Sequence, residues 1–148
     1  MGRWSSEEKG KALNPRYHLD ANVVLRFLRD DDPKQSAAAS RLFASAKAGK
    51  VRLAISAVTV AEAFYVLSRV YKHTRADAAS RLLPLLQSDV LEVADRNCVL
   101  DGLNRVVKAN VDFGDGYLAA TASESGDAVA SFDADLQLFP DVTTIVPS

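Results

Sequence analysis

Short apolar runs typical of β-strands recur along the chain, and helical segments separate each run from the next. The strand-like runs lie at 16–20, 51–56, 90–94, 127–132 and 142–146. Strands joined by helical crossovers pair in parallel, and a parallel sheet needs helices on both faces. The order β-α-α-β-α-α-β-α-α-β-α-β therefore predicts an α/β domain with a mostly parallel central sheet of about five strands.

Apolar residues at helical spacing mark the segments between the strands. These segments lie at 21–32, 34–50, 57–73, 75–88, 95–110, 114–126 and 133–139. Asp95 suits an N-cap, Gly49 and Gly126 suit helix ends, and Pro84 bends or ends the helix that contains it.

The length of 148 residues suits one domain, which we place at 16–148 after a polar extension at 1–15 that we expect to be flexible. A net charge of −1 argues against a strongly basic surface, so nucleic acid would have to meet a local patch of cations. No run approaches the ~20 apolar residues of a membrane span, and the N-terminus lacks the apolar region of a signal peptide. We therefore expect a cytoplasmic protein.

The N-terminus also fits the loose Met-Gly-x-x-x-Ser pattern for myristoylation, although a single acyl chain anchors weakly. Cys98 is the single cysteine, so it cannot form an internal disulfide, which fits a reducing compartment. We interpret Cys98 as a small core residue.

Four aspartates stand where strands end or where a helix begins. Asp20 and Asp133 close two strand-like runs, and Asp112 and Asp115 stand at the start of the helix near 114–126. Each one alone could be a helix cap. Ligands of open parallel sheets bind at the carboxyl ends of the strands, so these acids could also converge on one rim.

Glu62 is an acid in a mostly apolar helical segment, with Arg69 on the same helix face. Two interpretations stay open for it: a narrow solvated stripe shared with Arg69, or a carboxylate that lines a cleft.

Carboxylates ~5 Å apart repel each other by roughly 3 kcal/mol per pair at an effective dielectric constant near 20. A cluster of them would need protons or a cation. Oxygen ligands around a hydrated site suit Mg²⁺ or Mn²⁺ rather than zinc. His18 and His73 have no ligand spacing, and we interpret both as structural or exposed.

The ordered motifs "LDANVVL", "VAEAFYVL", "DFGDGYLAATA" and "SFDADL" resemble a PIN domain, and most closely the VapC-type ribonuclease toxins of toxin–antitoxin pairs. The resemblance covers residues 17–146 and implies a three-layer α/β/α sandwich and a metal-dependent endoribonuclease. By position, it implies a catalytic set of Asp20, Glu62, Asp115 and Asp133. Gly116 stands where the family usually has Ala, and Ser131 stands where Thr is common.

From the chemistry of phosphodiester hydrolysis we assign roles to these four acids and to Asp112. Asp20 and Asp115 would bind Mg²⁺ or Mn²⁺ directly, and Asp133 and Asp112 would complete the site. Glu62 would act through a water ligand or as a general base. We expect Ser131 and Asn22 to support the site: Ser131 by a hydrogen bond to a carboxylate, and Asn22 by donating to a phosphate, unless Asn22 only caps a helix.

Cations should flank such a site if RNA is the substrate. The candidates are Arg26, Arg29, Arg69, Lys72 and Arg75. The dense run at 69–75 could instead be a solvated helix end whose charges match the helix dipole. The surplus of apolar residues predicts a homodimer, and the resemblance implies an antitoxin protein that places an Arg among the carboxylates.

Three other functions remain open. A haloacid-dehalogenase-like phosphatase also has an early strand that ends in Asp, but it needs a second acid where this chain has Asn22. A PIN-domain nuclease could serve RNA processing or DNA metabolism instead of toxicity. A PIN-like module could also bind a partner without catalysis.

Overall fold

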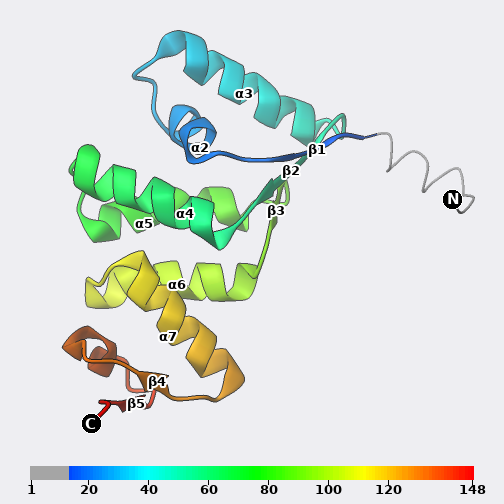
Figure 1. Ribbon diagram of the computed structural model, residues 1–148. Coiled ribbons are helices and arrows are strands. Elements are labelled where there is room, and N and C mark those ends of the chain that lie inside the picture. The colour runs from blue at the N-terminus through cyan, green and yellow to red at the C-terminus, as the bar shows by residue number, and fades with distance from the viewer. Residues whose placement is uncertain (1–13) are drawn as a thin grey trace, which may run out of the picture.

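Three parallel strands form one of two small sheets in the computed structural model, which describes residues 14–148 (Figure 1). The strands are β1 (Arg16–His18), β2 (Arg52–Ile55) and β3 (Leu91–Val93), in the order β1-β2-β3. Residues 1–13 of the expected extension lie outside the described part. The backbone carbonyl of Pro15 accepts a hydrogen bond from the Arg52 amide at 2.8 Å, so ordered pairing begins just before β1.

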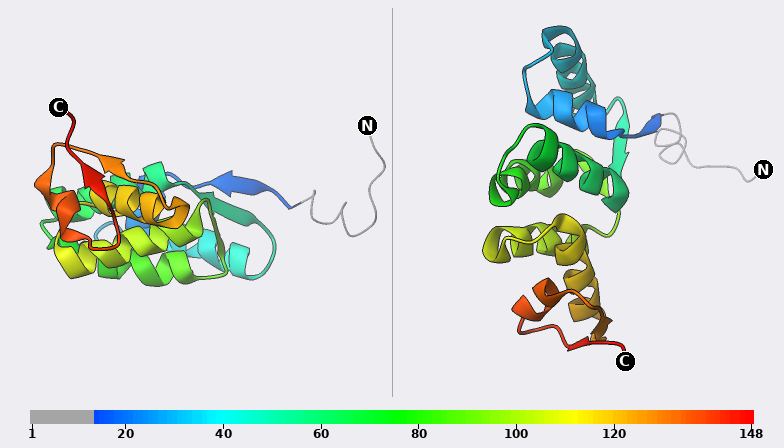
Figure 2. Two further views of the ribbon diagram at one scale, coloured as in Figure 1. Left: turned by 90° about the horizontal axis from the view of Figure 1, so that it is seen from below. Right: turned by 60° about the vertical axis from the view of Figure 1, so that its left-hand side comes forward.

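The second sheet is a parallel pair of two-residue strands, β4 (Val129–Ala130) and β5 (Thr144–Ile145). The prediction of parallel strands is confirmed, but the single sheet of about five strands is wrong. Within residues 14–148 the strands divide into a three-stranded and a two-stranded sheet. The helices therefore do not enclose a single five-stranded sheet as the predicted three-layer sandwich requires. Strands β4 and β5 lie at the opposite end of the molecule from β1 (Figures 1 and 2).

The helices follow the predicted order and include two short helices of other types. Residues Val66–Val70 form a π-helical turn, η1, and residues Ala134–Leu138 form a 3-10 turn, η2. The α-helices are α2 (Ala21–Leu28), α3 (Pro33–Lys47), α4 (Ala57–Tyr65), α5 (Arg75–Gln87), α6 (Arg96–Ala109) and α7 (Phe113–Ser125). Pro84 does not end its helix, because α5 continues to Gln87.

Side-chain oxygens define several helix starts. Asp32 accepts a hydrogen bond from the backbone amide of Gln35 at 3.1 Å, and Thr74 caps α5 in the same way. Asp95 does occupy the N-cap position of α6, but it lies at φ 56° and makes no capping hydrogen bond with its side chain to the described residues. Its carboxylate instead accepts a hydrogen bond from the Tyr117 hydroxyl at 2.5 Å.

Helices α6 and α7 pack closely because two glycines meet where they cross. A Cβ added to Gly116 would lie 2.4 Å from the carbonyl oxygen of Gly102. The missing side chain therefore lets the two backbones touch, and buried Val106 packs beside the crossing. Helices α6 and α7 lie between the first sheet and the pair of β4 and β5 (Figure 1).

No helix in the described part of the chain is both long enough and apolar enough to cross a membrane.

Candidate metal centre

Three carboxylates meet near the start of α7. Asp115 lies in the first turn of α7, Asp133 occupies the N-cap position of η2, and Asp135 lies in the first turn of η2. One oxygen from each lies within 4.8 Å of the others. The structure thus brings together two of the predicted site residues and adds Asp135. The sequence "DAD" contains a signal for this addition, because it places Asp135 two residues after Asp133, in the first turn of the same short helix.

Local hydrogen bonds hold the loop that carries Asp133. The Asp133 amide donates to Ser131 Oγ at 2.9 Å, and its Oδ1 accepts from the Asp135 amide at 2.9 Å. Asp133 is therefore a helix cap and a member of the carboxylate group at the same time. Ser131 thus holds the backbone of this loop, and the hydrogen bond from its hydroxyl to a carboxylate stays a prediction.

Burial and the neighbouring carboxylates both act on the pKa of Asp115. Burial is the largest cause that raises the pKa of Asp115 above its usual value, and the carboxylates of Asp133, Asp112 and Asp135 raise it further. Arg75 opposes this rise in pKa. An accumulation of negative charge around a half-buried carboxylate suits a divalent cation, and all of the donor atoms are the oxygens that Mg²⁺ and Mn²⁺ prefer.

Asp112 is paired with arginines instead of joining the three carboxylates. Its Oδ1 lies 3.3 Å from Arg75 Nε, and its Oδ2 lies 3.3 Å from Arg75 Nη2 and 3.9 Å from Arg69 Nη2. Arg75 also donates to the carbonyl oxygen of Asn110 at 2.9 Å. Two of the cations expected to bind RNA thus border the carboxylates, while exposed Lys72 follows η1 with φ 58°.

Asp20 and Glu62 lie outside the group of three carboxylates. Asp20 follows β1 at the N-cap position of α2, where its exposed side chain makes no capping hydrogen bond within the described chain. Capping therefore does not account for Asp20. Glu62 is exposed on α4, a helix that packs on both α2 and α7. Asn22 lines a hollow between α2 and α3, together with Arg26.

Local partners hold the other two candidate RNA-binding arginines. Arg26 donates to Asp31 Oδ1 at 3.0 Å, and Arg29 stacks on Tyr71 with 3.7 Å between its Cζ and the ring centroid. Arg29 Nη1 also lies 3.0 Å from His73 Nε2. His73 is therefore part of a packed polar contact, which fits the structural interpretation of this residue.

A second cluster combines Asp95, Cys98 and Glu124, each with one possible ligand atom within 4.8 Å of the others. The Cys98 thiol donates to Glu124 Oε2 at 2.6 Å. This hydrogen bond and burial raise the pKa of Cys98 to about 11. Cys98 is only 4% exposed, which confirms that it is a buried residue, and its thiol stays protonated at neutral pH.

Comparison with known families agrees with this arrangement of parallel strands and clustered acids. No curated protein matches the chain. The family model of the PIN domain matches residues 17–142, which is most of the described structure. PIN domains are generally nucleases that bind divalent metal ions through acidic residues. Since the match spans far more than half of the sequence, the chain belongs to the PIN domain family.

Proposed function

We propose that this protein is a Mg²⁺- or Mn²⁺-dependent endoribonuclease. The observation that carries the proposal is the meeting of Asp115, Asp133 and Asp135, together with the raised pKa of Asp115. Such a group of carboxylates opposes folding unless a cation or protons offset its charge. A PIN domain with this acidic group therefore has the donor set for a divalent ion.

Asp115, Asp133 and Asp135 would hold the ion, and Asp20 and Glu62 remain proposed catalytic residues. A divalent ion bound there lowers the pKa of a coordinated water and neutralises charge on a scissile phosphate. Ser131 keeps Asp133 in place through its bond to the backbone. The carboxylate of Glu62 would accept the proton of the attacking water, as a general base.

Arg69 and Arg75 supply the positive charge that an RNA backbone needs beside a negative site. Both point at Asp112, which holds their guanidinium groups at the edge of the carboxylate group. A phosphate of the RNA that displaces the Asp112 carboxylate would bind both guanidinium groups at one position. In this proposal Asp112 positions the arginines in the absence of RNA, in addition to the metal-binding role that the sequence suggested.

The biological role proposed is that of a toxin in a type II toxin–antitoxin pair, which acts in the cytoplasm and is neutralised by a cognate antitoxin protein. The order of the four sequence motifs supports this role. The alternatives are a PIN-domain nuclease of RNA processing or DNA metabolism and a PIN-like module that binds without cleaving.

The metal site is tested by thermal unfolding and by RNA cleavage in the same samples. Mg²⁺ or Mn²⁺ should raise the Tm of the wild type and should activate cleavage. At an ion concentration of 100 times Kd, the free energy of unfolding should rise by about 2.7 kcal/mol. Asp115→Asn should lose both effects. Asp127→Asn is the matched control, because Asp127 is exposed and lies outside the carboxylate group. Cleavage that persists in Asp115→Asn would refute the site.

The pH dependence of stability gives a second test of the same site. Because the pKa of Asp115 is raised in the folded state, its carboxylate destabilises the metal-free protein at neutral pH. This destabilisation is relieved as pH falls through the raised folded pKa towards the ordinary value. Asp115→Asn should accordingly be more stable than the wild type at pH 7 without metal, and the difference should shrink in acid.

The toxin role is tested by expressing wild type and Asp115→Asn in a bacterial host and sequencing RNA 5′ ends. Growth arrest with discrete cuts only in the wild type supports a toxin. Cleavage without arrest indicates a processing nuclease, and RNA binding without cleavage indicates a binding module.

A further inference from the structure

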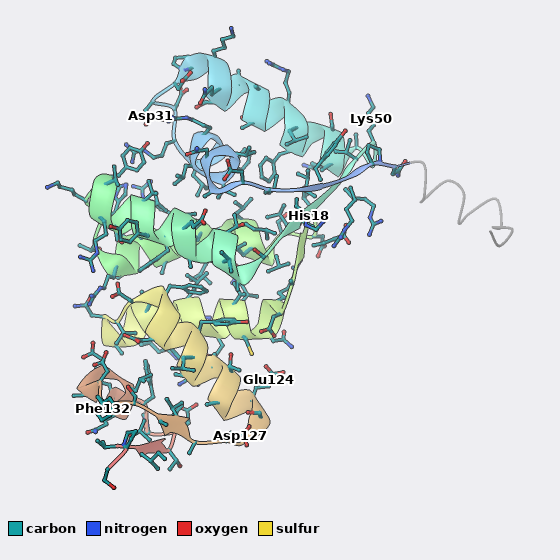
Figure 3. The ribbon with its side chains drawn as sticks, viewed as in Figure 1. His18, Asp31, Lys50, Glu124, Asp127 and Phe132 are labelled. Atoms are coloured by element: carbon teal, nitrogen blue, oxygen red, sulfur yellow. The ribbon has the colours of Figure 1, made fainter. Side chains whose placement is uncertain are left out.

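Phe132 directly precedes Asp133 and is the most exposed large apolar side chain in the described part of the chain, at 81%. Ser131 Oγ accepts a hydrogen bond from the Asp133 amide at 2.9 Å, and this bond closes a tight turn with Phe132 at its centre. Figure 3 shows Phe132 on the segment between β4 and η2, on the same side of the molecule as the start of α7. The turn therefore holds an uncovered aromatic ring next to a carboxylate of the candidate metal centre.

Packing inside the fold does not account for this ring. Burial of a phenylalanine stabilises a folded chain, and other phenylalanines of this protein are packed in pairs. Phe27 stacks on Phe43 with 4.0 Å between ring centroids, and Phe64 lies 6.3 Å from Phe113. Within the residues that the structure describes, no aromatic ring stacks on Phe132. Both faces of its ring are therefore open to a ligand.

A chain of neighbouring residues leads from the cations through the carboxylates to the ring. Arg75 contacts Asp112, which lies one helical turn before Asp115 on α7. Asp115 meets Asp133 in the carboxylate group, and Asp133 follows Phe132. Arginines attract the phosphates of a nucleic acid, and a flat aromatic ring attracts its bases. Both kinds of contact thus border the place where a scissile phosphate would bind.

The spacing suits a single nucleotide. Consecutive Cα atoms lie about 3.8 Å apart, so the Phe132 ring starts one residue from the Asp133 carboxylate. A nucleobase reaches farther than this from its own phosphate. A strand with a phosphate beside Asp133 can therefore lay an attached, unpaired base on the ring.

We propose that the ring of Phe132 stacks on the base of a nucleotide that borders the scissile phosphate, on the side away from Arg69 and Arg75. This inference rests on the proposed nuclease function and adds a specificity-determining residue to it. Stacking tolerates every base, but a purine offers a larger face than a pyrimidine. The enzyme should therefore cleave faster where this nucleotide is A or G than where it is C or U.

An abasic nucleotide tests the stacking directly. The cut made by the wild type is first mapped on a short unstructured RNA, and each of the two nucleotides that border the cut is then replaced in turn by an abasic nucleotide. At one of these positions, loss of the base should lower kcat/KM of the wild type by roughly 5- to 150-fold, the range of one base–aromatic stack. Phe132→Ala should lose a similar factor on the intact RNA. It should also cleave intact RNA and this abasic RNA at equal rates.

Three further variants separate stacking from other effects of the side chain. Phe132→Trp should keep the difference between intact and abasic RNA because it retains a flat ring, whereas Phe132→Leu should behave like Phe132→Ala. Leu138→Ala is the matched control, because Leu138 is also an exposed apolar side chain, at 56%, and lies in η2. It should respond to the abasic nucleotide as the wild type does. Mg²⁺ or Mn²⁺ should raise the Tm of every Phe132 variant, because Phe132 supplies no ligand atom.

The outcomes distinguish this inference from the nuclease proposal. If Phe132→Ala cleaves RNA and remains as sensitive to the abasic nucleotide as the wild type, the stacking is wrong and the nuclease stands. If the wild type binds RNA without cleaving it, the nuclease is wrong, and the same comparison of intact and abasic RNA is made on Kd. If the wild type neither binds nor cleaves RNA, both proposals are wrong.

Light scattering covers the remaining use of an exposed ring, which is a contact with another protein chain. If Phe132→Ala changes the mass of the protein in solution and leaves the comparison of intact and abasic RNA as in the wild type, the ring packs against protein. The stacking proposal is then wrong. An unchanged mass together with the loss of sensitivity to the abasic nucleotide supports it.

Discussion

Substitution of Gly116 by alanine should destabilise the protein, although alanine is the better helix former. The helix propensity alone predicts a gain of up to about 1 kcal/mol for Ala over Gly. In the structure, however, the new Cβ would lie 2.4 Å from the carbonyl oxygen of Gly102 and 3.4 Å from Val106 Cγ2. Real Cβ atoms essentially never come closer than 3.0 Å to another heavy atom, so α6 or α7 would have to move by about 0.6 Å.

Overpacking of this kind costs about 1–3 kcal/mol, and the obstacle here is backbone, which cannot rotate away. Subtracting the full gain in propensity leaves a net loss of up to about 2 kcal/mol in the free energy of unfolding. For a chain of this length, each kcal/mol lowers Tm by roughly 2–4 °C. Thermal melts followed by circular dichroism, with urea unfolding as a second measurement, have the necessary resolution.

Gly114→Ala is the matched control in the same helix. No heavy atom of the described chain lies within 4 Å of its added Cβ, so the substitution should be neutral or stabilise by about 0.4–1 kcal/mol. Opposite signs for the two variants are expected. If Gly116→Ala is as stable as Gly114→Ala, the close approach of α6 and α7 is not real.

Three other perturbations follow from the contacts. Arg105→Met removes the 2.8 Å bond from Nη1 to half-exposed Asp141, so we expect urea unfolding to show a loss of about 1–3 kcal/mol at pH 7. Because the hydrogen bonds from Arg105 hold the pKa of Asp141 below its usual value, this contribution is present above about pH 4 and should fade in stronger acid. Cys98 should react slowly with a thiol reagent at pH 8, since its pKa is about 11, and Glu124→Gln should speed the reaction by removing the main cause of that shift. Thr74→Ala should cost about 1 kcal/mol in a thermal melt because it removes the cap of α5.

The order and type of the elements could be predicted from the sequence because they depend on local patterns. Alternation and β-branched residues marked β2, and helical spacing marked α4 to α7. The parallel direction followed from the helical crossovers. The grouping of strands into sheets could not be predicted in this way. Strands as short as β4 and β5 carry few hydrogen bonds, so the packing of the helices beside them decides where they lie.

Some residues of the candidate site could likewise be predicted from the sequence, and others could not. Asp115 and Asp133 could be predicted because both stand at the ends of elements, and the structure brings them together. The inclusion of Asp135 and the pairing of Asp112 with Arg75 depend on side-chain directions that strand and helix patterns do not contain. The position of Asp20, away from this group, depends on where β1 ends relative to α7.

The sequence by itself determined the β-α-α order, the parallel sense of the strands, the buried Cys98 and the acids at the ends of elements, because each depends on a few neighbouring residues. Only the tertiary structure decided which acids meet. That choice depends on how helices from distant parts of the chain pack, as α6 and α7 do where Gly102 meets Gly116, and a local sequence pattern does not contain this packing.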